Sequence, residues 1–357
     1  MLLTAKKSLV ASAYGEAIFI YNGASSFVIK AASQVVAMTL NNEATLLICV
    51  TQDKKLIVYE MNSTRGEIVA SREVPRNTTS LVAATYQHDG NVNEAILIAG
   101  NAGEVNAYPL PDVNGNEKSL LQHTTSIITD VSMSTNGKYL LSADRDEKIR
   151  ISNFPATTLV QSYCLGHRQC VRKIAVSVAT PSLFVSVGLD DALNLWNIET
   201  GALIHSLELP ASETKQCGLS VCPITNRIAL VRNSEKIVRF FAIQNEKLVG
   251  LDLNLNISSD AQPTNVLFNE SGHLFVGFKQ TPFLLHFDMT SETHVLKKIA
   301  GFEAFAQIAK TIVLAYIALG DEAEDDGDSD DGELRKKKVK VSNWKSKMPG
   351  HKSKTQE

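Results

Sequence analysis

The chain has 357 residues, of which 44% are hydrophobic and 20% are charged, and its formal net charge is −3. These values are ordinary for a protein with a large core, and the small net charge argues against polyanion binding through bulk electrostatics. The five cysteines form no Cys-x-x-Cys pair or zinc-site spacing, so we expect buried, reduced thiols. No basic leader precedes an apolar run at the N-terminus, and no apolar stretch is long enough to cross a membrane. We therefore expect an intracellular protein without membrane contact.

Seven strand–turn–strand hairpins follow one another along the chain. Each consists of two short runs rich in β-branched and aromatic residues around a tight turn. Their final aromatic residues, or the equivalents, are Tyr21, Tyr59, Tyr108, Ser152, Trp196, Phe240 and Phe287. Successive members of this series are 38 to 49 positions apart, which is the period of a propeller blade. The sequence predicts an all-β fold, a seven-bladed β-propeller of the WD-repeat type over residues 1–300.

The fourth and fifth hairpins belong to two copies of one unit, displaced by 44 positions. The first copy contains His123, Asp146 and Ser152, and the second contains His167, Asp190 and Trp196. Buried polar groups need partners, and in such a blade the histidine, a strand serine, the turn aspartate and the tryptophan can form one hydrogen-bonded chain. We predict this structural network for His167, Ser186, Asp190 and Trp196, with His123 and Asp146 at the equivalent positions of the fourth unit.

A ring of blades must also close. We expect the first residues to lend a strand to the last blade, near Val295 to Ile299, although the sequence does not show which strand closes the ring.

The pattern changes after residue 300. Apolar residues recur at three- and four-residue steps over residues 301–320, at Phe302, Phe305, Ile308, Ile312, Tyr316 and Leu319. This spacing favours an amphipathic helix packed on the propeller rim, and a partner-docking helix or an extra strand are the alternatives. Residues 321–357 form an acidic block followed by a basic block, and neither can bury apolar surface. We expect this C-terminal tail to be disordered.

Motifs for catalysis are absent from the sequence. There is no phosphate-binding glycine-rich loop, no nucleophile elbow and no His-Glu-x-x-His zinc motif. We expect no catalytic residues and no metal site, and propellers commonly act as rigid platforms for other macromolecules.

The turn of the fourth hairpin carries an unusual number of charges. Lys148 and Arg150 share one face of the second strand with Ser152, which stands where a blade usually has a large tryptophan. One interpretation is that both cations simply extend to solvent. The other is a docking edge formed with Arg145 and Glu147, where Lys148 and Arg150 meet carboxylates of a partner, Arg150 bidentately.

A family resemblance favours the second interpretation. The run ADRDEKIRIS followed by SYCLGHRQCVRKI is similar to the non-catalytic WD-repeat subunit of the eukaryotic tRNA (guanine-N7)-methyltransferase, most strongly over about residues 121 to 200. The resemblance implies a heterodimer in which a catalytic partner carries S-adenosylmethionine and the active site. This chain would carry no cofactor, stabilise the partner and help orient tRNA in the complex. The resemblance also implies that Lys148 and Arg150 lie at the contact with the methyltransferase.

The basic run of the tail consists of Arg335, Lys336, Lys337, Lys338 and Lys340. We interpret it as a nuclear localisation signal, with a phosphate-contacting tail or a plain solvated charge run as alternatives. The expected location is therefore the nucleus, with the cytoplasm as a second site.

These observations predict an accessory subunit for tRNA N7-methylguanosine formation rather than an enzyme. The alternative function is a generic WD-repeat scaffold, such as a ubiquitin-ligase substrate receptor or a chromatin adaptor. An enzyme that acts alone is a third hypothesis, which the missing motifs disfavour.

Overall fold

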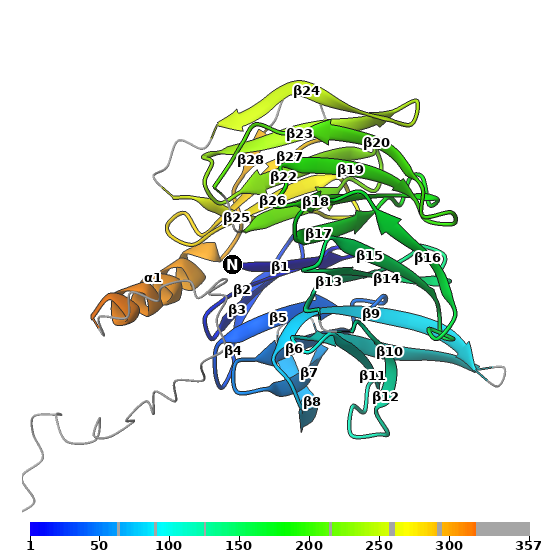
Figure 1. Ribbon diagram of the computed structural model, residues 1–357. Coiled ribbons are helices and arrows are strands. Elements are labelled where there is room, and N and C mark those ends of the chain that lie inside the picture. The colour runs from blue at the N-terminus through cyan, green and yellow to red at the C-terminus, as the bar shows by residue number, and fades with distance from the viewer. Residues whose placement is uncertain are drawn as a thin grey trace, which may run out of the picture. The chain divides into compact units, whose positions relative to one another are not determined.

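The computed structural model describes residues 1–62, 65–88, 91–124, 126–213, 216–256, 261–290 and 295–318. This part of the chain forms seven four-stranded sheets and one helix, so the predicted seven-bladed propeller is confirmed (Figure 1). Each predicted hairpin supplies the second and third strands of one sheet. The acidic segment 321–333 and the basic run Arg335–Lys340 lie outside the described residues.

Every sheet is an antiparallel meander of four consecutive strands. Blade 1 contains β1 (Leu2–Lys6), β2 (Leu9–Tyr14), β3 (Ala17–Tyr21) and β4 (Ser26–Lys30). Blade 2 contains β5 (Val35–Leu40), β6 (Leu46–Thr51), β7 (Lys55–Met61) and β8 (Gly66–Glu73). Blade 3 contains β9 (Thr78–His88), β10 (Asn91–Gly100), β11 (Glu104–Pro109) and β12 (Lys118–Gln122). Blade 4 contains β13 (Ile128–Met133), β14 (Tyr139–Asp144), β15 (Lys148–Asn153) and β16 (Val160–Leu165).

The last three blades repeat this order. Blade 5 contains β17 (Val171–Val176), β18 (Leu183–Gly188), β19 (Ala192–Asn197) and β20 (Leu203–Glu208). Blade 6 contains β21 (Cys217–Val221), β22 (Arg227–Arg232), β23 (Ile237–Gln244) and β24 (Lys247–Asn256). Blade 7 contains β25 (Pro263–Phe268), β26 (His273–Phe278), β27 (Leu284–Asp288) and β28 (Val295–Lys297).

The core lies between neighbouring blades. Among the described residues, each junction between adjacent sheets holds its own cluster of buried apolar side chains. Every residue of β6 and of β18 is buried, whereas the outermost strands β8 and β20 are largely exposed. The inner strands are covered on both faces, which explains why their sequences are continuous apolar runs without alternation. Each fully buried aliphatic side chain contributes about 1.5–3 kcal/mol.

The ring closes without exchange of a strand, so the expectation that the N-terminal strand joins the last blade was wrong. β1 pairs with β2, from Leu2↔Ala13 to Lys6↔Leu9, and β28 pairs with β27. The first strands of successive blades contact one another around the ring, and β1 contacts β25 at the closure. Because Val295–Lys297 already completes the fourth sheet position of blade 7, no place is left there for a strand from blade 1.

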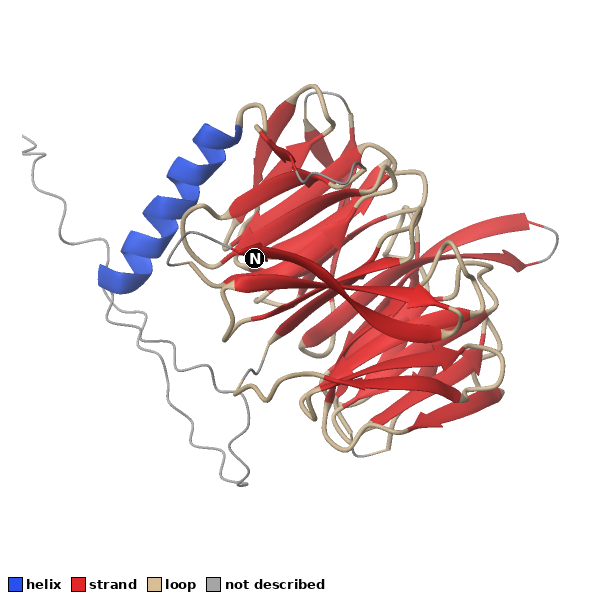
Figure 2. Cartoon of the chain, turned by 90° about the horizontal axis from the view of Figure 1, so that it is seen from above, coloured by secondary structure: helices blue, strands red, loops and turns tan. Residues whose placement is uncertain are grey.

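The segment after blade 7 is helix α1 (Phe302–Ala318), as favoured from its periodicity. It lies outside the sheets, at the junction of blades 7 and 1 (Figure 2). Phe305 is fully buried, and its ring centroid lies 5.4 Å from that of Phe19 in β3. Ile308, expected on the apolar face, is 41% exposed, and Ala309 is buried in its place. No helix of the described residues is long and apolar enough to cross a membrane.

Candidate functional site

The predicted polar network is present in blade 5. Nδ1 of His167 lies 3.0 Å from Oδ1 of Asp190, and Nε2 lies 2.7 Å from Oγ of Ser186. The indole N–H of Trp196 donates to the same serine oxygen at 2.8 Å. Burial raises the pKa of Asp190, but the hydrogen bonds from His167 and from the Arg168 N–H outweigh it and hold the pKa below its usual value. The network fixes the turn between β18 and β19 because every member has a partner.

Blade 4 uses a different aspartate, so the assignment of Asp146 to this network was wrong. His123 contacts Asp144 at 2.9 Å and Ser142 at 2.8 Å. Asp144 is the last residue of β14 and is buried, whereas the Asp146 side chain is 43% exposed and lies 3.9 Å from Arg145.

A glycine in blade 5 explains this difference. Gly188 follows Ser186 at the same interval by which Asp144 follows Ser142. A Cβ atom on Gly188 would lie 2.5 Å from Asp190 Oδ1 and 2.7 Å from His167 Nδ1. Any side chain at position 188 would therefore collide with the contact between the turn aspartate and the histidine. In blade 4 the carboxylate of Asp144 fills that place itself.

Arg150 is bound within its own blade. Its Nε donates to Oγ of Ser152 at 2.9 Å, and its Nη2 donates to the carbonyl of Thr157 at 2.9 Å. Ser152 and Thr157 are both buried, and the arginine is half-buried. The guanidinium thus partners the serine that replaces the usual tryptophan. Two of its donor atoms are already engaged, which leaves Nη1 for an external carboxylate.

Lys148, Arg145 and Glu147 are exposed at the end of the same hairpin. Glu147 has a φ of 73°, the left-handed conformation that lets this short turn close. Asp144 Oδ1 accepts the Lys148 main-chain N–H at 3.0 Å, so the buried network of blade 4 also holds the base of the charged turn.

The outermost strand of blade 4 (β16) and Leu159, which directly precedes it, expose apolar residues that the sequence interpretation missed. Leu159 is 61% exposed, Tyr163 is 49% exposed and Leu165 is 67% exposed. Lys148 pairs with Leu165 and Arg150 pairs with Tyr163 across β15 and β16, and directly opposed residues share a sheet face. The sequence signal that could have indicated these residues is the alternation along the strand, which places Tyr163 and Leu165 on the face opposite to Cys164. We name the blade 4 edge as Arg145, Glu147, Lys148, Leu159, Tyr163 and Leu165.

An exposed apolar edge strand is a surface that proteins normally avoid or use for binding. The blade 4 edge combines such a strand with two exposed cations from the neighbouring hairpin. This composition suits a partner surface that is apolar and bears carboxylates.

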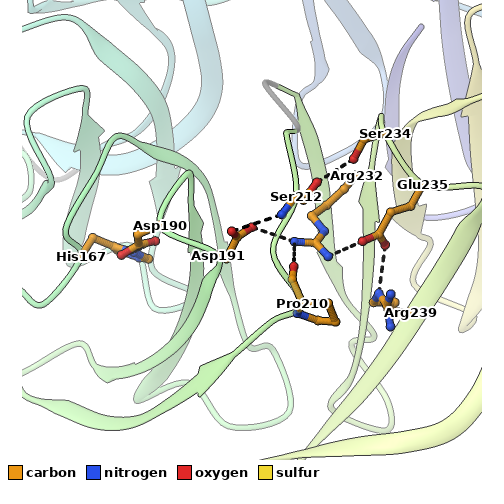
Figure 3. Close-up of polar contacts among 9 residues, drawn as sticks. All are labelled: His167, Asp190, Asp191, Pro210, Ser212, Arg232, Ser234, Glu235 and Arg239. Atoms are coloured by element: carbon orange, nitrogen blue, oxygen red, sulfur yellow. Dashed lines mark hydrogen bonds and ion pairs between the residues drawn. The ribbon is translucent and has the colours of Figure 1, made fainter.

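A second polar network, also missed from the sequence, joins blades 5 and 6 (Figure 3). Arg232 is 2% exposed, and its Nη1 donates to Asp191 at 2.8 Å and to the carbonyl of Pro210 at 2.7 Å. Its Nη2 pairs with Glu235, which also accepts from Arg239 at 2.9 Å. The network holds the hairpin turns of two blades together.

The potential metal ligands and the thiols of the described residues bear on whether this chain could perform catalysis. No cluster of three or more potential metal ligands occurs there. All five cysteines are free and buried, as expected, and burial raises the pKa of the Cys49 and Cys164 thiols to about 12. Such thiols are poor nucleophiles.

Comparison with known proteins identifies the family. The model described as "tRNA methyltransferase TRM82 WD40 domain" matches residues 113–304, more than half of the chain. The chain belongs to this family. The matched residues include the whole blade 4 edge.

Three relatives of this TRM82 family member are named as non-catalytic subunits of a tRNA (guanine-N(7)-)-methyltransferase. A protein of Drosophila mojavensis, "tRNA (guanine-N(7)-)-methyltransferase non-catalytic subunit wuho", is 31% identical over 44% of this chain and 39% of its own length. The corresponding subunits named wdr4 from Xenopus laevis and WDR4 from Homo sapiens are 29% and 26% identical. Their matches cover 68% and 75% of this chain, and 62% and 67% of the relatives. The chain thus spans about two thirds or less of the curated relatives it matches.

Solved structures share the fold of the TRM82 family member at low identity. A chain of the mitotic checkpoint complex superimposes with a TM-score of 0.66 at 14% identity, over 80% of this chain and 87% of its own. The β-propeller domain of Cps50 (Swd1) from Myceliophteria thermophila superimposes with a TM-score of 0.65 at 9% identity, over 79% of this chain and 94% of its own. These similarities concern the propeller fold alone.

Proposed function

We propose that this chain is the non-catalytic subunit of a heterodimeric tRNA (guanine-N7)-methyltransferase, and that it stabilises the catalytic subunit and helps orient tRNA. The match of residues 113–304 to the TRM82 WD40 family carries this proposal. The names of the relatives agree with it. Methyl transfer would take place on the partner, which would bind S-adenosylmethionine, while this chain would act as a rigid scaffold.

The catalytic subunit docks on the blade 4 edge in this proposal. Lys148 and Arg145 would face carboxylates of the partner, and Tyr163 and Leu165 would be buried in the contact. Apolar area would supply most of the affinity, because exposed charge pairs contribute little once screened by water and salt. The cations would mainly set orientation and association rate.

The docking site is tested by co-purification with the catalytic subunit. Leu165→Asp and Lys148→Glu should each weaken the complex, and together they should abolish co-purification while the thermal transition stays unchanged. Lys247→Glu is the matched control, because Lys247 is also an exposed lysine at a strand start, but in blade 6. Wild-type affinity in the double variant would refute the docking site.

The function is tested separately by depletion. Loss of the chain should lower N7-methylguanosine in tRNA, and restoring it should recover the modification. The purified chain with S-adenosylmethionine and tRNA but without a partner should transfer no methyl group. Normal tRNA methylation after depletion would instead favour a generic WD-repeat scaffold.

Nuclear import through the basic run Arg335–Lys340 is part of the proposal. Replacement of Lys336, Lys337 and Lys338 by alanine should move a fluorescent fusion of the full chain from the nucleus to the cytoplasm. An unchanged nuclear signal would show that these lysines do not direct import.

A further inference from the structure

One end of the central channel is an open cavity of about 460 Å³. It is bounded by residues at the beginning of the first strands of six blades: Leu2, Thr79, Thr129, Arg172, Cys217 and Thr264. This volume lies in the range of sites that bind small ligands or a few inserted side chains. We call it the channel mouth.

The two cationic side chains at the channel mouth differ in their pairing, and burial lowers the pKa of the Met1 amino group there to about 6. Nζ of Lys173 lies 3.1 Å from Oδ1 of Asp130, which also accepts from Ser80 at 2.8 Å. The charge of Lys173 is therefore compensated. Arg172 is half-buried, and it has no hydrogen bond or ion pair to any residue that the structure describes. A partly desolvated guanidinium without a partner is unfavourable unless a ligand supplies the counter-charge.

The hydrogen-bond donors of the uncharged side chains at the mouth indicate which kind of ligand it can bind. The hydroxyls of Thr79, Thr129 and Thr264 each donate to a main-chain carbonyl, at 3.2, 2.6 and 3.2 Å, and so have no proton left for a ligand. Oδ1 of Asn265 accepts the Val266 N–H at 2.9 Å. The amide NH₂ of Asn265 therefore remains a donor, without a partner among the described residues. This amide and the Arg172 guanidinium are two donors at the mouth that have no partner among the described residues.

We propose that the channel mouth binds an acidic segment of a partner protein, with one carboxylate held by Arg172 and assisted by Asn265. A guanidinium matches a carboxylate in a two-pronged hydrogen bond. RNA fits less well, because a nucleic-acid strand is held by a series of cations along its phosphates, and Arg172 is the one cationic side chain of the mouth that lacks a counter-charge among the described residues. None of the residues that line the mouth belongs to the blade 4 edge, and the proposed occupant is a second ligand besides the catalytic subunit.

Photo-cross-linking tests the site on the full chain. The probe is octaglutamate carrying a benzophenone group, and cross-linked residues are mapped by mass spectrometry. Cross-links are expected on the residues that line the channel mouth. Arg172→Gln should reduce them about tenfold or more, the effect of losing one charge-assisted pair. Arg168→Gln is the matched control, because Arg168 is a nearby arginine that is 73% exposed and 3.9 Å from Glu208.

Three results would overturn the proposal. The first is equal cross-linking of the mouth in the Arg172→Gln and Arg168→Gln variants. The second is cross-linking confined to the lysines of residues 335–354. The third is Arg172-dependent binding of octauridylate that is tighter than that of octaglutamate, which would assign the mouth to RNA. Octaglutamine, which has the same length but no charge, should give no mouth cross-links. Co-purification of the catalytic subunit should be unaffected by Arg172→Gln, which separates this test from that of the proposed function.

Discussion

Asp191 of blade 5 accepts a 2.8 Å hydrogen bond from Arg232 of blade 6, while the adjacent Asp190 bonds to His167 inside blade 5 (Figure 3). Two consecutive acidic residues of one turn therefore serve different contacts, one within a blade and one between blades. The turn of blade 5 is fixed from both sides as a result.

Arg232→Met should destabilise the protein strongly. The change leaves the carboxylates of Asp191 and Glu235 without their buried counter-charge, and breaking a buried pair in this way costs about 3–5 kcal/mol. Chemical denaturation of the variant measures the loss. Arg168→Met removes an exposed arginine and should change stability by less than about 1 kcal/mol. Similar losses in the two variants would contradict the role of the buried network.

Asp144→Ala should be more damaging than Asp146→Ala. Removal of the Asp144 carboxylate leaves Nδ1 of buried His123 without its partner, while Nε2 keeps Ser142, and should cost about 1–3 kcal/mol. Asp146 is a surface turn residue, and its removal should change stability by no more than about 0.5 kcal/mol. Comparison of the two free energies of unfolding is the measurement. The reverse order would restore the assignment that the repeat spacing suggested.

Helix α1 should contribute to closing the ring, because its side chains fill the cluster between blades 7 and 1. Phe305→Ala removes a fully buried ring there and should cost about 3–5 kcal/mol. Ile308→Ala, on the exposed side of the same helix, should have little effect. Thermal unfolding of both variants is the measurement. If neither variant differs from wild type, the helix does not stabilise the closure of the ring.

Lys148 and Arg150 should respond differently to charge reversal. Arg150→Glu places a carboxylate beside the Thr157 carbonyl and removes the Ser152 partner, so it should lower the melting temperature. Lys148→Glu should leave the melting temperature unchanged and weaken only the binding of the catalytic subunit. Differential scanning calorimetry combined with pull-down assays separates the two effects. A lower melting temperature for both variants would mean that Lys148 is also structural.

Acid should weaken blade 7 through a histidine pair. Burial lowers the pKa of His286 from 6.5 to about 4, assisted by His273, whose Nδ1 lies 2.8 Å from His286 Nε2. The unfolded chain therefore binds a proton that the folded chain does not bind between these values. The resulting stability is present above pH 6.5 and is lost as the pH falls towards 4. In His286→Leu the free energy of unfolding should fall less steeply over this range, and parallel curves would contradict the assignment.

The sequence by itself determined the seven blades, the helical character of residues 302–318 and the blade 5 network. These features follow from local chemistry: the hairpin period, the three- and four-residue apolar spacing, and a buried His-Ser-Asp-Trp set whose polar groups must pair with one another. The run from Ala143 to Ser152 also indicated the family, because it is a contiguous motif.

Only the tertiary structure decided how the ring closes, which aspartate meets His123 and what Arg150 contacts. Each of these contacts depends on how side chains pack in three dimensions, and the intervals between residues along the sequence do not determine it. Gly188 leaves room for Asp190, whereas Asp144 fills the same place in blade 4. Ser152 and Thr157 come together around Arg150. Lys173 forms an ion pair with Asp130, whereas the adjacent Arg172 has no partner in the described part of the chain. Distances between groups on different strands and blades are fixed by packing, and no repeat within the sequence encodes them.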